Sequence, residues 1–292
     1  MITNENTQDN RANELAPRKH SRVILFYYSS MRSALLYNEI LASYSWIFDC
    51  VIEMPAIPYS RNTGKRNIKK IFKILFNSPG FFLMQVMLVK VYTFLSALFK
   101  NSIKDLCKKN KIEHYYFDSV DDNLISFIKE RNPEWIISST STLLPKKFLD
   151  VPLNGVINFH EAPLPKYKGS ASYFWFIVND EKFASTTVHY VSEKLDSGPI
   201  IFKGPKVKVL QSSVFTLWFK LLLTYKSSWE FILPYLINGN KLPSEDQPKS
   251  DQKTYSFPDK ESNKILRSKK IPFITFHDTK FIIDAAIRGL KI

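Results

Sequence analysis

The stretch from Gly155 to Lys203 is the most informative part of the chain, and it reads GVINFHEAPLPKYKGSASYFWFIVNDEKFASTTVHYVSEKLDSGPIIFK. It begins with a short run of apolar and β-prone residues at 155–159, and a similar run follows at 186–191. Short apolar runs bounded by Pro, Gly, Asn or Asp predict buried strands. The stretch therefore predicts two strands of a sheet, each ending in polar side chains.

The same pattern of short apolar runs and helical stretches continues outward on both sides of this segment. Strands that alternate with helices predict an α/β fold, here an open, mostly parallel twisted sheet with helices on both faces. Beyond Gly239 the chain becomes polar and proline-rich, which indicates an irregular C-terminal tail. The other expected strands are Arg22–Tyr28, Trp46–Glu53, Ile112–Asp118 and Glu134–Ser138, and the expected helices are Ser33–Ser43, Asp121–Arg131 and Phe215–Leu236.

Three regions follow from this pattern. Residues 1–20 are polar and lack an apolar core, so we expect a disordered lead-in rather than a signal peptide. Residues 21–210 would form the main domain, with an apolar and basic helical insertion at about 60–110. Residues 211–292 would form a helix and a tail that pack on this core. The two cysteines are far apart in sequence, which indicates buried thiols in a reducing compartment.

The chain is strongly basic, and part of its excess of positive charge lies in the insertion. The formal net charge is +14, and no Asp or Glu occurs between Met54 and Lys104. Within this segment, 71–99 is very apolar, and three alternatives remain open for it: a helix packed on the domain or on a partner subunit, a basic membrane-surface element, or a transmembrane span. Pro79-Gly80 at its edge and Lys90 near its centre count against a span.

An amide, an imidazole and a carboxylate are expected at the strand ends. Asn158 and His160 would share one face of their strand, and Asp196 lies in the polar turn after the second strand. The amide and a protonated imidazole can donate to an oxyanion, while the carboxylate can orient the imidazole and accept an amine proton. With no Ser or Cys in the set, this favours acyl transfer by direct amine attack. A strand-end Asn and His that only cap a turn remain the alternative.

These residues resemble the core of the folate-dependent formyltransferases, the family that includes glycinamide ribonucleotide, methionyl-tRNA and sugar N-formyltransferases. Its pattern is N-x-H-x-S-L-L-P-x-x-x-G followed by D-x-G. This chain has NFHEAPLPKYKG at 158–169, and Asp196 follows at the family's spacing. The resemblance covers about Trp135 to Lys203 and continues more weakly as far as Leu242. It implies the Rossmann-like formyltransferase fold.

The resemblance also implies a set of roles. Asn158, His160 and Asp196 would be the catalytic trio, 10-formyltetrahydrofolate the co-substrate, and no metal would be needed. The Leu164–Pro165 peptide would be cis, as is frequent in the family. The segment 140–145, which is otherwise a plain strand-to-helix turn, and the loop that leads to Asp196 would hold the pterin. The implied cofactor contacts are Thr140, Ser141, Thr142, Leu143, Leu144, Val191 and Leu195.

Departures from the family pattern bear on the acceptor. Ala162-Pro163 replaces the usual Ser-Leu, and no glycine precedes Gly64, so a glycine-rich phosphate loop is missing after the first strand. The residues after Leu242 are too few for the β-barrel that methionyl-tRNA enzymes append, and their YSFP ending resembles compact, sugar-modifying members. For His189, a structural role and a substrate contact both remain open. The candidate acceptor contacts are Tyr28, Arg32, Lys166, Tyr167, Gly169 and His189.

The sequence thus predicts a formyltransferase acting on a primary amine, with a nucleotide-linked amino sugar for surface polysaccharide favoured. The rival acceptor is an aminoacyl-tRNA, supported mainly by the net charge, although we do not expect a nucleic-acid partner. An inactive folate-binding module is a further alternative, and the intact trio argues against it. We expect a cytoplasmic protein; a homodimer and a peripheral contact with the inner membrane face through residues 60–100 are left open.

Overall fold

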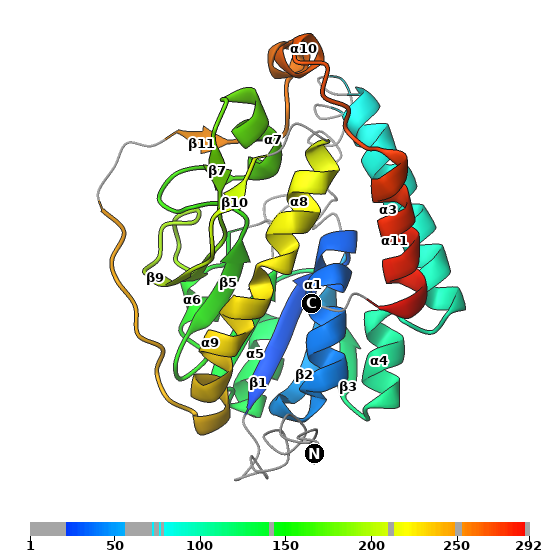
Figure 1. Cartoon of the computed structure of the whole chain (residues 1–292). Helices are drawn as coiled ribbons and strands as arrows, with labels where there is room; N and C mark the ends of the chain where they lie inside the picture. Colours follow the sequence, from blue (N-terminus) through cyan, green and yellow to red (C-terminus); the bar gives the residue numbers. More distant parts are fainter. Residues whose placement is uncertain are drawn as a thin grey trace, which may run out of the picture.

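A computed structural model describes residues 22–55, 72, 76, 79–139, 143–209, 213–248 and 253–289. The expected lead-in at 1–20 lies outside the described residues, as does most of the basic segment before residue 79. Figure 1 shows a central sheet flanked by helices on both sides. The predicted α/β fold with a mostly parallel sheet is therefore confirmed.

The main sheet has seven strands in the order β3-β2-β1-β4-β5-β8-β9. The first five of these run parallel to one another, and β8 pairs antiparallel with β5 and with β9. All six predicted strands are present, within two residues of the expected bounds. The strands are β1 (Val23–Tyr28), β2 (Phe48–Met54), β3 (Glu113–Tyr116), β4 (Trp135–Ser139), β5 (Val156–His160), β8 (Thr187–Tyr190) and β9 (Ile200–Lys203).

Strand β1 is the centre of this sheet because its side chains are buried on both faces. Val23, Leu25 and Tyr27 belong to the larger apolar cluster, whereas Ile24 and Phe26 belong to the smaller one on the opposite face. This alternation follows from the period of two along a strand. The larger cluster is covered by α1 (Met31–Ser43), α7 (Ser172–Val178), α8 (Val214–Leu223) and α9 (Tyr225–Asn238), and the smaller one by α5 (Asp122–Arg131) and α6 (Lys146–Leu149).

Two expectations need correction. The single helix expected at Phe215–Leu236 is two helices, α8 and α9, which meet at Thr224. The tail expected to be irregular contains two further helices, α10 (Lys260–Ser268) and α11 (Phe276–Arg288). The expected domain boundary near residue 210 stays a prediction.

The expected helical insertion is present as α3 (Pro79–Leu98), followed by the short α4 (Ile103–Lys109). Figure 1 shows α3 beside α11 at one edge of the molecule. Asn101, just after α3, donates from its side chain to the carbonyl of Ile287 near the end of α11, so the two helices run in the same direction. Helix α11 therefore packs against the insertion.

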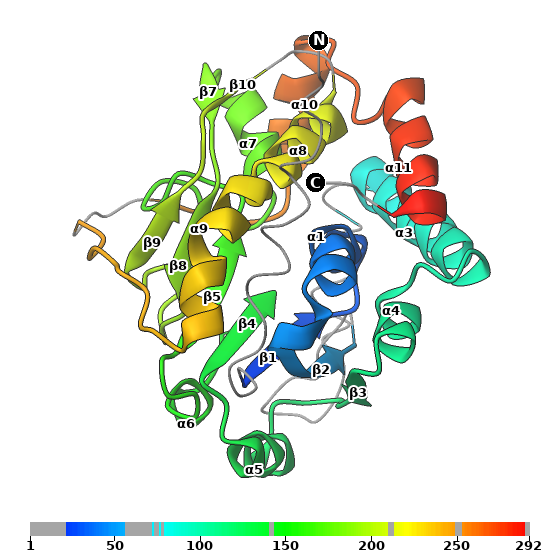
Figure 2. The same cartoon turned by 60° about the horizontal axis from the view of Figure 1, so that its bottom comes forward.

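The remaining strands are short and lie in two small sheets. One pairs β6 (Lys168–Gly169) with β11 (Thr254–Tyr255), and the other pairs β7 (Phe183–Ala184) with β10 (Val207–Lys208). In Figures 1 and 2, β7 and β10 lie at the opposite edge of the molecule from α3. The pairing of β6 with β11 fixes the position of Gly169, whose N–H donates to the Asp196 carboxylate.

Candidate active site

Strands β5 and β8 place the polar side chains of the candidate site next to one another. In the antiparallel register, Asn158 lies directly opposite His189, and His160 lies two residues further along the same face. The Asn158 amide nitrogen is 3.2 Å from Nε2 of His189. The strand pairing therefore brings together an amide and two imidazoles from residues that are distant in sequence.

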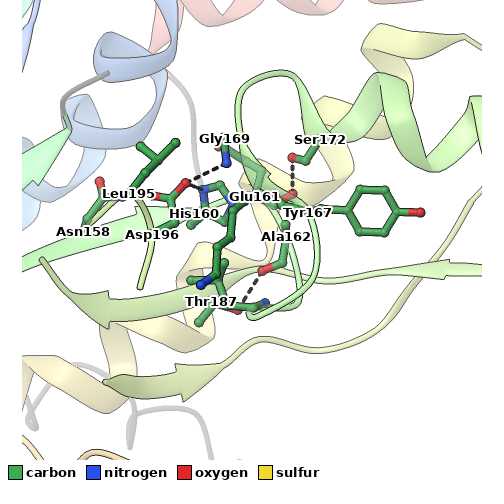
Figure 3. A network of polar contacts seen from close by, with 12 residues as sticks. Asn158, His160, Glu161, Ala162, Tyr167, Gly169, Ser172, Thr187, Leu195 and Asp196 are labelled. Atoms are coloured by element: carbon green, nitrogen blue, oxygen red, sulfur yellow. Dashed lines mark hydrogen bonds and ion pairs between the residues drawn. The ribbon is translucent and has the colours of Figure 1, made fainter. Parts of the chain in front are cut away.

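Asp196 completes this group, and its carboxylate faces both imidazoles. Its Oδ2 lies 3.8 Å from Nδ1 of His160, and its Oδ1 lies 3.8 Å from Nε2 of His189. Figure 3 shows the carboxylate between His160 and the backbone N–H of Gly169, which donates to Oδ2 over 2.8 Å. The predicted trio Asn158, His160 and Asp196 is thus assembled at one place, with His189 as a fourth member.

Hydrogen bonds to carbonyl groups fix the orientation of both imidazoles. Nε2 of His160 donates to the Tyr167 carbonyl over 3.0 Å, which leaves Nδ1 directed at Asp196. Nδ1 of His189 donates to the Tyr190 carbonyl over 2.8 Å, so Nε2 can accept from the Asn158 amide when the ring is neutral. A ring nitrogen held in this way has a defined tautomer.

The pKa values of His189 and Asp196 are both lowered, but for different physical reasons. Burial lowers the pKa of His189 to about 4, and the Asp196 carboxylate only partly opposes this effect. Burial also disfavours ionisation of Asp196, but His160, His189 and the Gly169 N–H outweigh it and hold its pKa below the usual value. At neutral pH the site therefore contains an ionised Asp196 beside a neutral His189.

The side-chain oxygen of Asn158 is buried and has no hydrogen-bond partner among the described residues. A buried acceptor without a partner is costly and needs an explanation, such as a catalytic role or a bound water or ligand. The amide thus offers one N–H to His189 and keeps a free oxygen and a second N–H. The chemistry of this group suits an amine that donates to the oxygen and an oxyanion that accepts from the nitrogen.

Two glycines fix the loops that hold Asp196. Gly169 has a φ of +104°, and a side chain there would meet the carbonyl oxygen of Tyr255 on β11. At Gly198 an added Cβ would lie 2.0 Å from the carbonyl oxygen of Tyr190. The close approach of the loop to β8 therefore requires a glycine at 198. Gln247 strengthens the same loop, because its side chain donates to the carbonyls of Asp196 and Gly198 over 3.0 and 2.7 Å.

The turn after β5 has the expected backbone. The Leu164–Pro165 peptide is cis, as predicted. Thr187 on β8 donates to the Ala162 carbonyl over 2.6 Å, and the Leu164 N–H donates to the same hydroxyl over 3.2 Å. The Thr187 hydroxyl thus holds the turn that contains Ala162 and Leu164 against the neighbouring strand.

The predicted acceptor contacts fall into different environments. The ring of Tyr167 points away from His160 and Asp196 in Figure 3, and its hydroxyl donates to Glu181, so its contribution to the site is its carbonyl. Lys166 is exposed, whereas Tyr28 is buried in the smaller apolar cluster. Contact of these residues with a substrate stays a prediction.

Arg32 has a partner that the sequence did not reveal. From α1 its guanidinium donates to the Glu161 carboxylate, to the Ser139 hydroxyl and to the Phe159 carbonyl. Burial opposes the charge of Arg32, but Glu161 outweighs it and raises the pKa of Arg32 further. Arg32 therefore ties α1 to the ends of β4 and β5, and the Glu161 charge compensates its own.

Four of the seven predicted folate contacts lie among the described residues. Thr140, Ser141 and Thr142 lie outside the described residues. Leu144 is buried in the smaller cluster, and Val191 packs against that cluster. Leu143 and Leu195 are exposed apolar side chains, and Leu195 directly precedes Asp196. Among the described residues no group of His, Cys, Asp and Glu side chains could hold a metal ion.

Part of this chain is similar in sequence to known proteins. Residues 92–214 match the family model described as formyl transferase. The methionyl-tRNA formyltransferase of Thermodesulfovibrio yellowstonii is 38% identical over 99 residues, which cover 34% of this chain and 30% of that protein. The matched part thus spans less than a third of that relative's length. The family-model match at 92–214 includes β5, β8 and the turn after β5.

Two solved structures share the fold at low sequence identity. The phosphoribosylglycinamide formyltransferase of Anaplasma phagocytophilum has a TM-score of 0.52 and 16% identity, covering 80% of this chain and 97% of that chain. A sugar N-formyltransferase from Shewanella has a TM-score of 0.50 and 13% identity, covering 81% and 77%. Residues 92–214 are thus similar to the formyl transferase family, and the two solved structures share the fold of the chain.

Proposed function

We propose that this protein transfers a formyl group from 10-formyltetrahydrofolate to a primary amine, and that the amine belongs to a nucleotide-linked sugar. The observation that carries the proposal is the Asp196 carboxylate shared by His160 and His189, next to an Asn158 amide with an unpartnered oxygen. The family match over residues 92–214 supports the same reaction type.

The residues fit a formyl donor that is held at the end of the sheet. The exposed apolar side chains of Leu143 and Leu195 would contact its pterin, together with the predicted segment that begins at Thr140. When bound, the folate supplies an activated formyl group. A low-polarity surface beside a polar amide and carboxylate is the usual composition of such a ligand site.

The chain's own groups then have distinct tasks. Asn158 accepts an N–H of the attacking amine at its free oxygen and donates to the oxygen on which negative charge develops. His160, held by the Tyr167 carbonyl, directs Nδ1 toward Asp196. The ionised Asp196 takes up an amine proton directly or through water. Because no Ser or Cys side chain is among these groups, direct attack by the amine is the simplest course.

The region before the site disfavours glycinamide ribonucleotide, whose enzymes have a glycine-rich phosphate loop there, and so leaves a sugar nucleotide as the preferred small acceptor. The first turn of α1 is capped by Ser30 and is not preceded by a glycine-rich loop. The charge of Arg32 in this turn is already compensated by Glu161. This first turn therefore does not offer a free guanidinium to a phosphate. The fold match to a sugar N-formyltransferase is compatible with this acceptor class.

A second acceptor has a specific observation in its favour. The relative with 38% identity is described as a methionyl-tRNA formyltransferase, and the net charge of +14 suits a nucleic acid. Incubation with 10-formyltetrahydrofolate and either a panel of nucleotide-linked amino sugars or methionyl-tRNA, followed by product mass measurement, separates the two. A formylated sugar nucleotide supports the proposal, whereas formylation of methionyl-tRNA alone would refute the acceptor.

A further inference from the structure

We propose that the exposed face of α3 docks on the surface of an anionic lipid bilayer. This face consists of side chains at helical spacing that point away from the domain. All but Lys90 and Thr93 are apolar. The face comprises Leu83, Val86, Met87, Lys90, Val91, Thr93, Phe94, Ala97 and Leu98, all of them exposed.

The apolar exposure is large for a surface helix. Met87 is 57% exposed and Phe94 is 68% exposed, and Phe99 continues the face beyond the last turn. Exposed apolar residues that are scattered singly are ordinary, but a contiguous row of them along five turns marks a site of contact. No described residue covers this row.

The opposite side of α3 holds the helix on the domain. Leu88 and Tyr92 are buried in the larger cluster, and Asn38 of α1 donates to the Tyr92 hydroxyl over 3.3 Å. The described residues contain one candidate span by length and composition, Leu83–Lys109, with a mean hydropathy of 1.4. Because this packing ties α3 along its length, the helix suits a position in the plane of a bilayer surface.

The charges around this face favour an anionic partner. From Pro79 to Ile112 the only acidic residue is Asp105, and its carboxylate is used in capping α4 at Ser102. Lysines follow the apolar row on its C-terminal side, and Lys90 lies within the row. A lysine within an apolar face can extend its ammonium group to lipid phosphates while its methylenes stay in contact with the apolar surface. The exposed lysines are Lys90, Lys100, Lys104, Lys108, Lys109 and Lys111.

The same charges count against a second copy of the chain as the occupant. A two-fold contact through α3 would bring like faces together and place Lys90 of each copy in the apolar interface. With no acidic residue on α3, nothing on the helix could compensate these ammonium groups. A bilayer that presents phosphates avoids this repulsion.

The test measures partition of the full chain onto vesicles by sedimentation. We expect binding to vesicles that contain phosphatidylglycerol and much weaker binding to pure phosphatidylcholine. The Met87→Glu/Phe94→Glu protein should lose more than about tenfold in partition. The Lys100→Gln/Lys104→Gln/Lys108→Gln protein should lose on the order of a hundredfold, at about tenfold or less per lysine.

Matched controls come from exposed residues outside α3 and α4. Leu153 and Phe183 are 75% and 54% exposed, so Leu153→Glu/Phe183→Glu should bind like the wild type. Lys182→Gln/Lys206→Gln/Lys208→Gln removes three exposed charges near β7 and β10 and should cost at most a few fold. Circular dichroism and thermal unfolding verify that each variant is folded.

Three results would overturn the proposal. These are failure of the wild type to bind phosphatidylglycerol vesicles, equal losses in the test and control variants, or a dimer in light scattering that Phe94→Glu converts to a monomer with vesicle binding unchanged. Formyl transfer to a soluble acceptor, measured without vesicles, reports separately on the proposed function. The two claims can therefore fail independently.

Discussion

At the scale of single residues, the site depends on one carboxylate that faces two imidazoles in different protonation environments. His189 is 2% exposed and has a lowered pKa, whereas Asp196 is held ionised by its neighbours. His189 therefore acts as a neutral acceptor for the Asn158 amide and fixes its orientation. We therefore expect His189 to be a positioning residue, and its protonation should disturb the site.

Protonation of His189 should make the folded state less stable in acid. In the unfolded chain a histidine titrates near 6.5, and in the folded protein the pKa of His189 is about 4. As pH falls below 6.5 the unfolded state binds the proton first, so stability is lost between 6.5 and 4, by roughly 3 kcal/mol in total. Urea unfolding at both ends of this range should show a larger loss for the wild type than for His189→Asn. Equal losses would contradict the assignment.

The loop that carries Asp196 should not tolerate a side chain at residue 198. In Gly198→Ala the new Cβ would meet the Tyr190 carbonyl, so the loop must move. We expect a loss of about 1–3 kcal/mol in the free energy of unfolding, together with reduced activity. Gly80→Ala is the control, because a Cβ at Gly80 has nothing within 4 Å. Equal stability of the two variants in urea unfolding would show that the close approach is unimportant.

At the scale of secondary-structure elements, the Arg32–Glu161 pair connects α1 to the end of β5. The side chains are 24% and 11% exposed, so both charges are largely shielded from water. Arg32 also donates to Ser139 at the end of β4. The pair thus fixes where the first helix begins relative to the turn that follows His160.

Replacing one residue of this pair should lower the free energy of unfolding more than the loss of the whole pair would suggest. Arg32→Met leaves Glu161 buried without its partner and should destabilise by about 3 kcal/mol. The double variant Arg32→Met/Glu161→Gln should lose clearly less than the sum of the single variants in urea unfolding. Lys203–Glu245, with both side chains 62% exposed, is the control pair, and its variants should stay within about 1 kcal/mol. Strict additivity at Arg32 and Glu161 would contradict a coupled pair.

The elements that could be predicted are those with a local signal. The buried parallel strands are continuous apolar runs, so β1, β4 and β5 were found close to their true bounds. The helices α10 and α11 were missed although each begins with a capping box, Asp259 with Ser262 and Thr275 with Asp278. That spacing is visible in the sequence and could have revealed both helices.

The rest of the site depends on pairings between distant segments. Glu161 lies 129 residues from Arg32, and Gln247 lies 51 residues from Asp196. The two-residue strand β11 forms only because it pairs with β6. None of these contacts has a local pattern, whereas Asn158, His160 and Asp196 were recognisable because their spacing is that of the family. The position of Tyr167, whose ring leaves the site, also follows from its stacking on Tyr255.

At the scale of the whole molecule, the basic charge has two interpretations that differ in salt dependence. A tRNA acceptor would release many counterions, and its binding would weaken steeply with salt. A sugar nucleotide carries few charges, so we expect its KM to rise only a few fold between low and physiological salt. Steady-state kinetics over this range test the difference. A KM that rises by several powers of ten would indicate a polyanionic acceptor.

We expect formyl transfer to depend most directly on the trio at the ends of β5 and β8. The decisive measurement is the rate of formyl transfer from 10-formyltetrahydrofolate to the accepted amine by wild type, His160→Ala and Asp196→Asn. With unfolding curves showing folded proteins, kcat/KM should fall by about 10²–10⁴-fold in each variant, because the oriented imidazole or the proton acceptor is lost. Transfer at a rate near that of the wild type in both variants would show that this group of residues does not carry the reaction.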